Sequence, residues 1–227
     1  MTEKRVAPLM AGLRNQIDDH SLMVRLGTDF PIPDQTLLLF ARAQYADCVT
    51  WIPMLALMRD RCINSILRQA IWDNICDEAG QHRPSHVTMA QRFIASLRLP
   101  AELSNVAHYT PASWHSYQIM MKLAHTGTEA TIAGWVLAQE YLVPVFFAAF
   151  RKRFELIPGV DIDYLVEHEE VDTDRHYQWL LEAVDSLCQE REVWGEVESG
   201  ILMSARSVLS VLDWLSVDMS EVLEAER

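Results

Sequence analysis

The chain has 227 residues, half of them hydrophobic, with a formal net charge of −13 and a mean hydropathy of zero. This length and balance predict one globular domain with a sizeable core, and the acidic charge argues against binding to nucleic acid or to an anionic membrane surface. No apolar run reaches the roughly 20 residues that a membrane span needs, and the charged N-terminus is unlike a signal peptide.

The four cysteines show neither CxxC spacing nor the dense framework of a disulfide-stapled domain; they are Cys48, Cys62, Cys76 and Cys188. We expect reduced, mostly buried thiols in a cytoplasmic protein. A catalytic cysteine would need an activating base, and none is recognisable near these four in the sequence.

Helical patterns separated by Pro, Gly or capping residues run along the whole chain. Only 8 Gly and 9 Pro interrupt them, which favours long helices over turn-rich β structure. Residues 126–129 read as a capping box that opens a helix. The expected helices cover about 7–26, 35–61 with a kink at Pro53, 64–80, 85–99, 110–125, 128–154, 161 or 163 to 189, and 193–224. The fold expected is an all-α, single-domain helical bundle of about seven to eight helices.

The helix that begins near Asp163 carries ionisable groups on its apolar stripe. At 100° per residue, His168, Asp172 and His176 fall within one band 80° wide. Polar groups on a buried stripe must be paired or bound, because burying them alone is costly. The alternative is that the acidic first half of this helix is simply solvated.

Glu140 is the lone acid in an otherwise apolar stretch, AGWVLAQEYLVPVFFAAF, which predicts a central helix of the bundle. A buried carboxylate there is either hydrogen-bonded for structural reasons or bound to a metal ion. Glu78 shares a helix face with Ile71 and Ile75, so it can also point inward, and His86 follows it across a loop. His82 competes with His86, but Gly80 and Pro84 place it in the loop, where it would face solvent.

Together these positions give three carboxylates and three imidazoles, a donor set that suits iron or manganese better than a thiolate-preferring ion. The predicted ligands are Glu78, His86, Glu140, His168, Asp172 and His176. Ferritin-like di-iron bundles carry a Glu-x-x-His motif on two helices. No Glu in this chain has His three residues later, so that frame is excluded.

Four segments in order resemble the heme-oxygenase-like di-iron oxidases, relatives of the TenA and PqqC proteins. The resemblance covers nearly the whole chain. It rests on the opening His20-Ser-Leu-Met with Gln44-Tyr45 and Trp51-Ile52-Pro53, on Asn74-Ile-Cys-Asp-Glu78-Ala-Gly80 with Ser85-His86, on Glu140-Tyr-Leu-Val-Pro144, and on His168-Glu-Glu-Val-Asp172 followed by His176.

One departure concerns the closing motif, which in that family usually reads His-x-x-x-Asp-x-x-His. Here His176 comes one residue late and Arg175 stands in the expected place. An inserted residue in a π-bulge would return His176 to the ligand face, which is the interpretation we favour. The alternative is that Arg175 replaces the ligand, which would leave a weakened second metal site or an anion-binding one. His20 is a candidate axial ligand for heme, but the sequence has no evident glycine-rich distal helix of the kind that heme oxygenases use. A structural or capping role is the interpretation we favour for His20.

The resemblance implies O₂ activation by two Fe(II) ions per chain, directed at a small amino-acid-like or fatty-acid-like substrate. Glu78, Glu140 and Asp172 would balance charge and bridge the ions, with the histidines as terminal ligands. Arg175 and Tyr177 are candidate substrate contacts. We expect no nucleic-acid or membrane partner, and a homodimer is compatible with the family. The competing hypotheses are a metal-free enzyme of the PqqC or TenA kind and a non-enzymatic helical interaction module.

Overall fold

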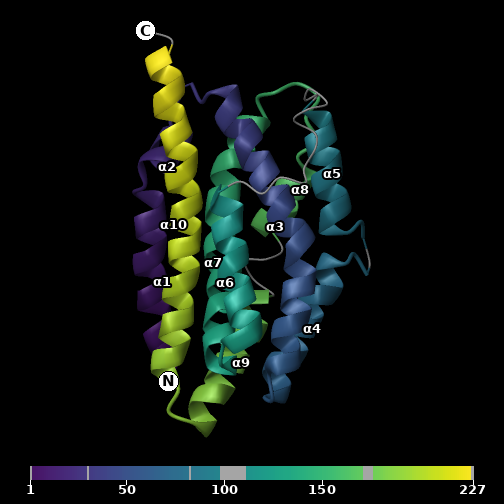
Figure 1. The fold of residues 1–227 in the computed structure, drawn as a ribbon, viewed down its shortest axis with the longest axis vertical. Coiled ribbons are helices and arrows are strands. Elements are labelled where there is room, and N and C mark those ends of the chain that lie inside the picture. Colours follow the sequence, from purple (N-terminus) through teal and green to yellow (C-terminus); the bar gives the residue numbers. More distant parts are fainter. Residues whose placement is uncertain (1, 30, 82, 98–110, 171–175, 226–227) are drawn as a thin grey trace.

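The computed structural model describes residues 2–29, 31–81, 83–97, 111–170 and 176–225, which form ten helices and contain no strand. Figure 1 shows most of the long helices running along the longest axis of the molecule, with α10 along one side. The helices are α1 (Glu3–Asp18), α2 (Ser21–Leu26), α3 (Asp34–Arg61), α4 (Ser65–Glu78), α5 (His86–Ser96), α6 (Pro111–Thr126), α7 (Glu129–Phe154), α8 (Asp163–Glu170), α9 (Tyr177–Glu190) and α10 (Trp194–Ala225).

The expected all-α bundle is confirmed, but the expected number of seven to eight helices is too low, because two predicted helices are each divided. The first divides at His20, whose extended backbone ends the helical path. Its Nδ1 accepts a hydrogen bond from the amide of Leu22 and caps α2, while Nε2 lies 3.1 Å from Asp213. His20 is therefore a capping residue. The second division separates α8 from α9, and residues 171–175 between them lie outside the described part of the chain.

The central helix is α7, which packs along α10 and also contacts α3, α8 and α9. Two glycines bring α7 and α10 together. A Cβ at Gly134 would lie 2.0 Å from the carbonyl oxygen of Val197, and one at Gly200 would lie 2.2 Å from that of Thr131. Since no larger residue fits between these backbones, the glycines set the close approach of α7 and α10.

The same helix is, by length and composition alone, apolar enough to cross a membrane, and it is the one such helix among the described residues. Within its most apolar window, 67% of the residues are buried inside the fold. That burial is what the sequence pattern predicts for a central helix of a bundle, which is apolar nearly all round.

Phenylalanines from α3, α5 and α7 fill the core at one end of the bundle. Phe40 stacks on Phe150 with ring centroids 3.8 Å apart, and Phe93 meets Phe154 edge-on at 4.8 Å. All four rings are fully buried. Removing each from water stabilises the fold by roughly 2 to 3 kcal/mol, which anchors the helices that carry the polar groups described below.

The start of α7 differs in detail from the expected capping box. The capping residue is Thr128, whose hydroxyl accepts the amide of Thr131, so the predicted box opening at residue 126 is wrong by two positions. Glu129 instead reaches across to α4, where its carboxylate accepts the backbone amides of Ile63 and Asn64 at 2.8 and 2.9 Å. Glu129 does not complete the expected capping box, because the amides of Ile63 and Asn64 precede α4 without helical partners and bind its carboxylate instead.

Candidate metal centre

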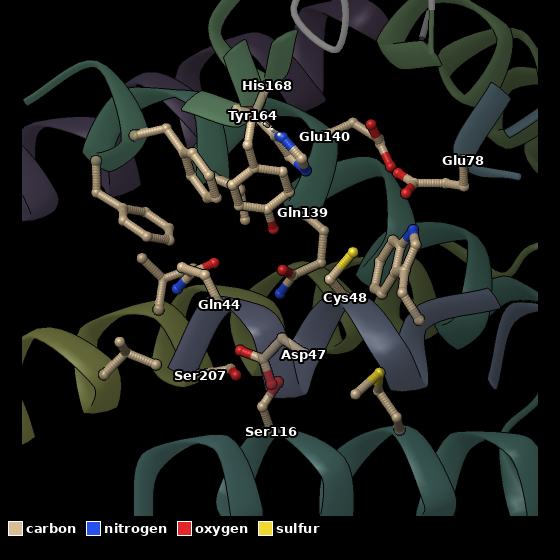
Figure 2. Close-up of a pocket in the computed structure, with 17 residues that line it drawn as sticks. Gln44, Asp47, Cys48, Glu78, Ser116, Gln139, Glu140, Tyr164, His168 and Ser207 are labelled. Atoms are coloured by element: carbon tan, nitrogen blue, oxygen red, sulfur yellow. Dashed lines mark hydrogen bonds between the residues drawn. The ribbon is translucent and has the colours of Figure 1, made fainter. Parts of the chain in front are cut away.

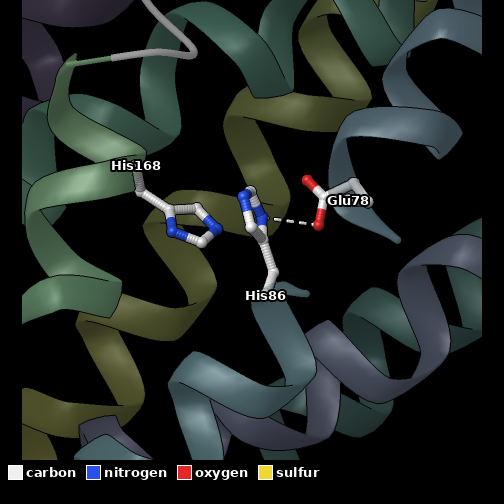
Figure 3. A group of neighbouring side chains, drawn as sticks. All are labelled: Glu78, His86 and His168. Atoms are coloured by element: carbon white, nitrogen blue, oxygen red, sulfur yellow. Dashed lines mark ion pairs between the residues drawn. The ribbon is translucent and has the colours of Figure 1, made fainter. Parts of the chain in front are cut away.

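Glu78, His86 and His168 meet in the interior of the bundle, from the end of α4, the start of α5 and the middle of α8 (Figure 3). One donor atom from each lies within 4.8 Å of the other two. Their side chains are buried, with residue exposures of 5, 0 and 8%. Three metal-ligating groups this close together, withdrawn from water, form a candidate ligand set for one cation.

A sharp turn between α4 and α5 places the first two of these residues side by side. Gly80 has a φ of +79°, and a Cβ there would lie 2.4 Å from a backbone oxygen, so only glycine fits. Ser85 then caps α5 by accepting the amide of Thr88, which makes His86 the first helical residue. Nδ1 of His86 thereby lies 2.6 Å from Oε2 of Glu78.

His168 is oriented by its own helix. Its Nδ1 lies 2.8 Å from the carbonyl oxygen of Tyr164, one turn earlier. Because a carbonyl can only accept, Nδ1 carries the proton and Nε2 keeps its lone pair for a ligand. Phe147 stacks on the ring with centroids 4.6 Å apart, and the ring of His86 lies at the same distance. A backbone carbonyl behind a histidine is the usual arrangement at metal sites.

A second group of polar side chains surrounds His176. Its Nδ1 lies 3.1 Å from Oε2 of Glu140, and its Nε2 lies 3.0 Å from Oδ2 of Asp77. Asn74 donates to the other oxygen of Glu140 at 2.7 Å, and Trp51 donates to the oxygen of the Asn74 amide at 3.4 Å. Asn74, Glu140 and His176 are almost fully buried, so this network holds Glu140 in one orientation.

The backbone at His176 is π-helical, and the residue is 1% exposed. Despite the inserted residue in the closing motif, His176 reaches the interior of the bundle and lies beside Glu140. Asp172 and Arg175, the other two predicted site residues of this segment, lie outside the described residues, as does His82. Tyr177 is half-buried and packs on Tyr141 with ring centroids 5.3 Å apart.

A cavity joins the two groups of ligands to the middle of the bundle. It encloses about 720 Å³ of space not filled by protein atoms, part of it open to solvent. In Figure 2 the carboxylates of Glu78 and Glu140 point toward one another at one side of it. Two carboxylates facing each other in a buried site repel unless a cation or a proton lies between them.

The other residues that line the cavity divide into polar and apolar ones. They include the aromatic residues Trp51 and Tyr164. Asp47 gave no signal in the sequence, because it lies within a helix whose residues are buried on several faces. The polar lining residues are Gln44, Asp47, Cys48, Glu78, Ser116, Gln139, Glu140, Tyr164, His168 and Ser207; the apolar ones are Trp51, Met120, Val143, Phe146, Phe147, Val208 and Val211.

Burial sets the protonation of three of these groups. Burial, reinforced by the charge of Glu78, raises the pKa of the Cys48 thiol well above its ordinary range. Burial likewise raises the pKa of Tyr164, which contacts Cys48. Burial raises the pKa of Asp47 to about 8. Cys48 is therefore a neutral thiol at physiological pH and lacks the thiolate character of a nucleophile.

A family model described as "Iron-containing redox enzyme" matches residues 38–207. The chain belongs to this family. The matched region contains every described residue of both ligand groups. Comparison with curated proteins gives no significant match.

Solved structures show the same architecture. A domain of unknown function from Shewanella denitrificans with a heme oxygenase-like fold is 17% identical, with 96% of this chain and 93% of that one covered and a TM-score of 0.77. A CADD-like protein of unknown function from Nostoc punctiforme is 15% identical, with coverages of 93 and 97% and a TM-score of 0.72. A TenA homolog from Pseudomonas syringae is 13% identical, with coverages of 95 and 92% and a TM-score of 0.74. The fold of this family member is heme-oxygenase-like.

The residues present fit the metal that the family description implies. The donors are imidazole nitrogens and carboxylate oxygens, which suit iron. The facing carboxylates of Glu78 and Glu140 would be relieved by positive charge between them. The carbonyl behind His168 presents the second ring nitrogen of that residue toward the ligand cluster.

Proposed function

We propose that this family member is a non-heme di-iron enzyme that activates O₂ to oxidise a small amino-acid-like or fatty-acid-like molecule. The observation that carries the proposal is the buried meeting of Glu78, His86 and His168. A second buried pair, Glu140 and His176, lies on the neighbouring helices and borders the same cavity through Glu140. Two sets of donors beside one cavity match two metal ions better than one.

The proposed ligands divide by chemistry. His86, His168 and His176 would be terminal ligands, each through one ring nitrogen. Glu78 and Glu140 would hold the metal through carboxylate oxygens, since their carboxylates face each other (Figure 2). Asp172 completes the expected set from the sequence alone. Carboxylates at three of six positions would offset most of the charge of two divalent ions inside the bundle. Bound iron supplies the capacity to activate O₂ and to accept electrons from the substrate.

The chain's own residues keep the site dry and correctly oriented. The Tyr164 carbonyl fixes the tautomer of His168, and the Asn74 amide holds one oxygen of Glu140 in place. Phe147 stacks on the ring of His168 and Phe146 lines the same cavity, so apolar surface adjoins the proposed ligands and disfavours water beside them. A substrate in the cavity would lie directly beside Glu78 and Glu140.

The proposal is tested by anaerobic titration of the full chain with Fe(II), followed by exposure to O₂. We expect close to two irons per chain and O₂ consumption that depends on iron. His168→Ala should lose at least one iron, whereas His115→Ala, which removes an exposed histidine of α6, should bind iron as the wild type does.

Failure of the wild-type protein to bind iron would overturn the proposal and favour a metal-free enzyme or an interaction module of the same fold. The neutral thiol of Cys48 already argues against a cysteine nucleophile in such a metal-free enzyme. Equal iron binding by the wild type and by His168→Ala would show that the metal lies elsewhere.

A further inference from the structure

The cavity has a second polar region, away from the ligand residues. In Figure 2, Gln44, Asp47, Ser116 and Ser207 gather at the side opposite Glu78, Glu140 and His168. They come from α3, α6 and α10, whereas the ligand residues come from α4, α5, α7 and α8. The proposed di-iron chemistry makes no use of these four side chains, although burying polar groups in a core is costly.

Among these four side chains, Asp47 is the one with a buried oxygen that lacks a hydrogen-bond donor in the described part of the chain. Its Oδ1 atom is buried and accepts no hydrogen bond from the residues that the structure describes. A buried carboxylate oxygen without a donor is strongly unfavourable when charged. Gln44, Ser116 and Ser207 beside it are 5, 9 and 3% exposed, so the surroundings are polar but shielded from bulk water.

Asp47 lies away from the one histidine among the described residues that line the cavity: His168 is on the opposite side (Figure 2). Among these described residues none is lysine or arginine, while Asp47, Glu78 and Glu140 are all acidic. A ligand that ends in a carboxylate would meet acidic side chains on both sides of the cavity, Asp47 on one and Glu78 with Glu140 on the other. A ligand that carries positive charge would find an unpaired acceptor at Asp47.

The cavity also has an apolar part. Met120, Val143, Phe146, Phe147, Val208 and Val211 line it. This surface suits a hydrocarbon body whose polar group is fixed at one end, which is the common design of a small-molecule site.

We infer that the cavity recognises a primary amine with an apolar body, whose ammonium group binds Asp47 while its other end reaches the side of Glu78 and Glu140. The inference rests on the proposed function for the role of that second end, and it narrows the substrate class to amines. Asp47 is the residue that decides specificity, and Gln44, Ser116 and Ser207 offer oxygens for the remaining ammonium protons.

The elevated pKa of Asp47 agrees with this role. In the unliganded protein the carboxyl is mostly neutral at pH 7, because burial raises its pKa to about 8. An arriving ammonium group stabilises the charged form, so the acid loses its proton as the amine binds. A neutral alcohol gives no such stabilisation.

The test is binding of n-hexylamine, n-hexanol and hexanoate to the full chain without added metal, measured by calorimetry or by fluorescence of Trp51 and its neighbours. We expect hexylamine to bind about tenfold or more tightly than either of the other two. Asp47→Asn, an isosteric change, should lower hexylamine affinity about tenfold while hexanol affinity changes little. Circular dichroism and thermal melting establish that the variant is folded.

Glu140→Gln serves as the matched variant, since it removes an acid from the other side of the same cavity. Loss of amine preference in Glu140→Gln but not in Asp47→Asn would place the ammonium group at the ligand residues and overturn the inference. Equal affinities for hexylamine and hexanol, or a preference for hexanoate, would also overturn it. These outcomes are independent of the iron titration. A chain that binds no iron can still bind amines preferentially, and a chain that binds two irons can lack that preference.

Discussion

Oδ2 of Asp77 lies 3.0 Å from Nε2 of His176, where the end of α4 meets the start of α9. The other ring nitrogen, Nδ1, lies 3.1 Å from Glu140. An imidazole binds a metal ion through one nitrogen and usually donates from the other to a carboxylate or carbonyl. Asp77 is therefore placed to hold His176 in the orientation that turns Nδ1 toward the proposed second metal ion.

Replacing Asp77 by alanine tests this arrangement. We expect the affinity for the second Fe(II) to fall about 10- to 100-fold, the range found when a carboxylate behind a ligating histidine is lost. The measurement is anaerobic titration with Fe(II). Asp73→Ala is the control, because that acid lies one turn earlier on α4 and accepts a hydrogen bond from Gln69 at the surface. Two equally tight irons in Asp77→Ala would show that His176 needs no such support.

Metal binding should stabilise the fold, since the ligands come from helices far apart in the sequence. At a free metal concentration of about 100 times Kd, the free energy of unfolding rises by about 2.7 kcal/mol. Thermal melting with Mn(II), which resists oxidation by air, measures this rise, and a chelator should reverse it. In Glu78→Gln the rise should shrink or vanish. A rise of the same size in that variant would mean that Mn(II) binds without Glu78.

Gly200→Ala should destabilise the protein by about 2 kcal/mol or more, because a new methyl group would press on the backbone of α7, which cannot yield without moving the helix. Gly12→Ala is the matched control: a Cβ at this helical position of α1 meets nothing within 4 Å. That substitution should stabilise the protein by up to about 1 kcal/mol through helix propensity. Urea unfolding of the two variants gives the comparison, and equal effects would contradict the close approach of α7 and α10.

The buried acid Asp47 should make stability depend on pH. Its pKa is about 8 in the folded protein and about 3.9 when unfolded, so the folded state binds the extra proton between these values. The contribution of Asp47 to the free energy of unfolding is fully present below about pH 4. It is lost as the pH rises toward 8, by roughly 1.4 kcal/mol per pH unit. Asp47→Asn removes this loss, so the variant should gain on the wild type from pH 5 to pH 8. Urea unfolding at several pH values measures it; parallel curves for the two proteins would contradict it.

The sequence by itself determined the helical architecture and most helix ends. Apolar spacing and capping residues suffice for this because helix formation depends on neighbours three and four residues away. Local information also marked Glu78 and Glu140 as acids on apolar faces. It placed Pro53 within a helix and Gly80 at the end of one. It missed the division at His20, where the side chain caps a new helix instead of continuing the old one.

Only the tertiary structure decided which of these polar groups meet. Glu78 and His168 are 90 residues apart in the chain, and their contact depends on how α4 packs against α3 and α8 packs against α7, which no local pattern specifies. Asp77 and Asn74 became part of the site because α9 brings His176 to the same face of α4. An acid within α3 looks ordinary in the sequence, and Asp47 becomes distinctive only because α6 and α10 enclose it in a cavity whose described lining includes no lysine or arginine.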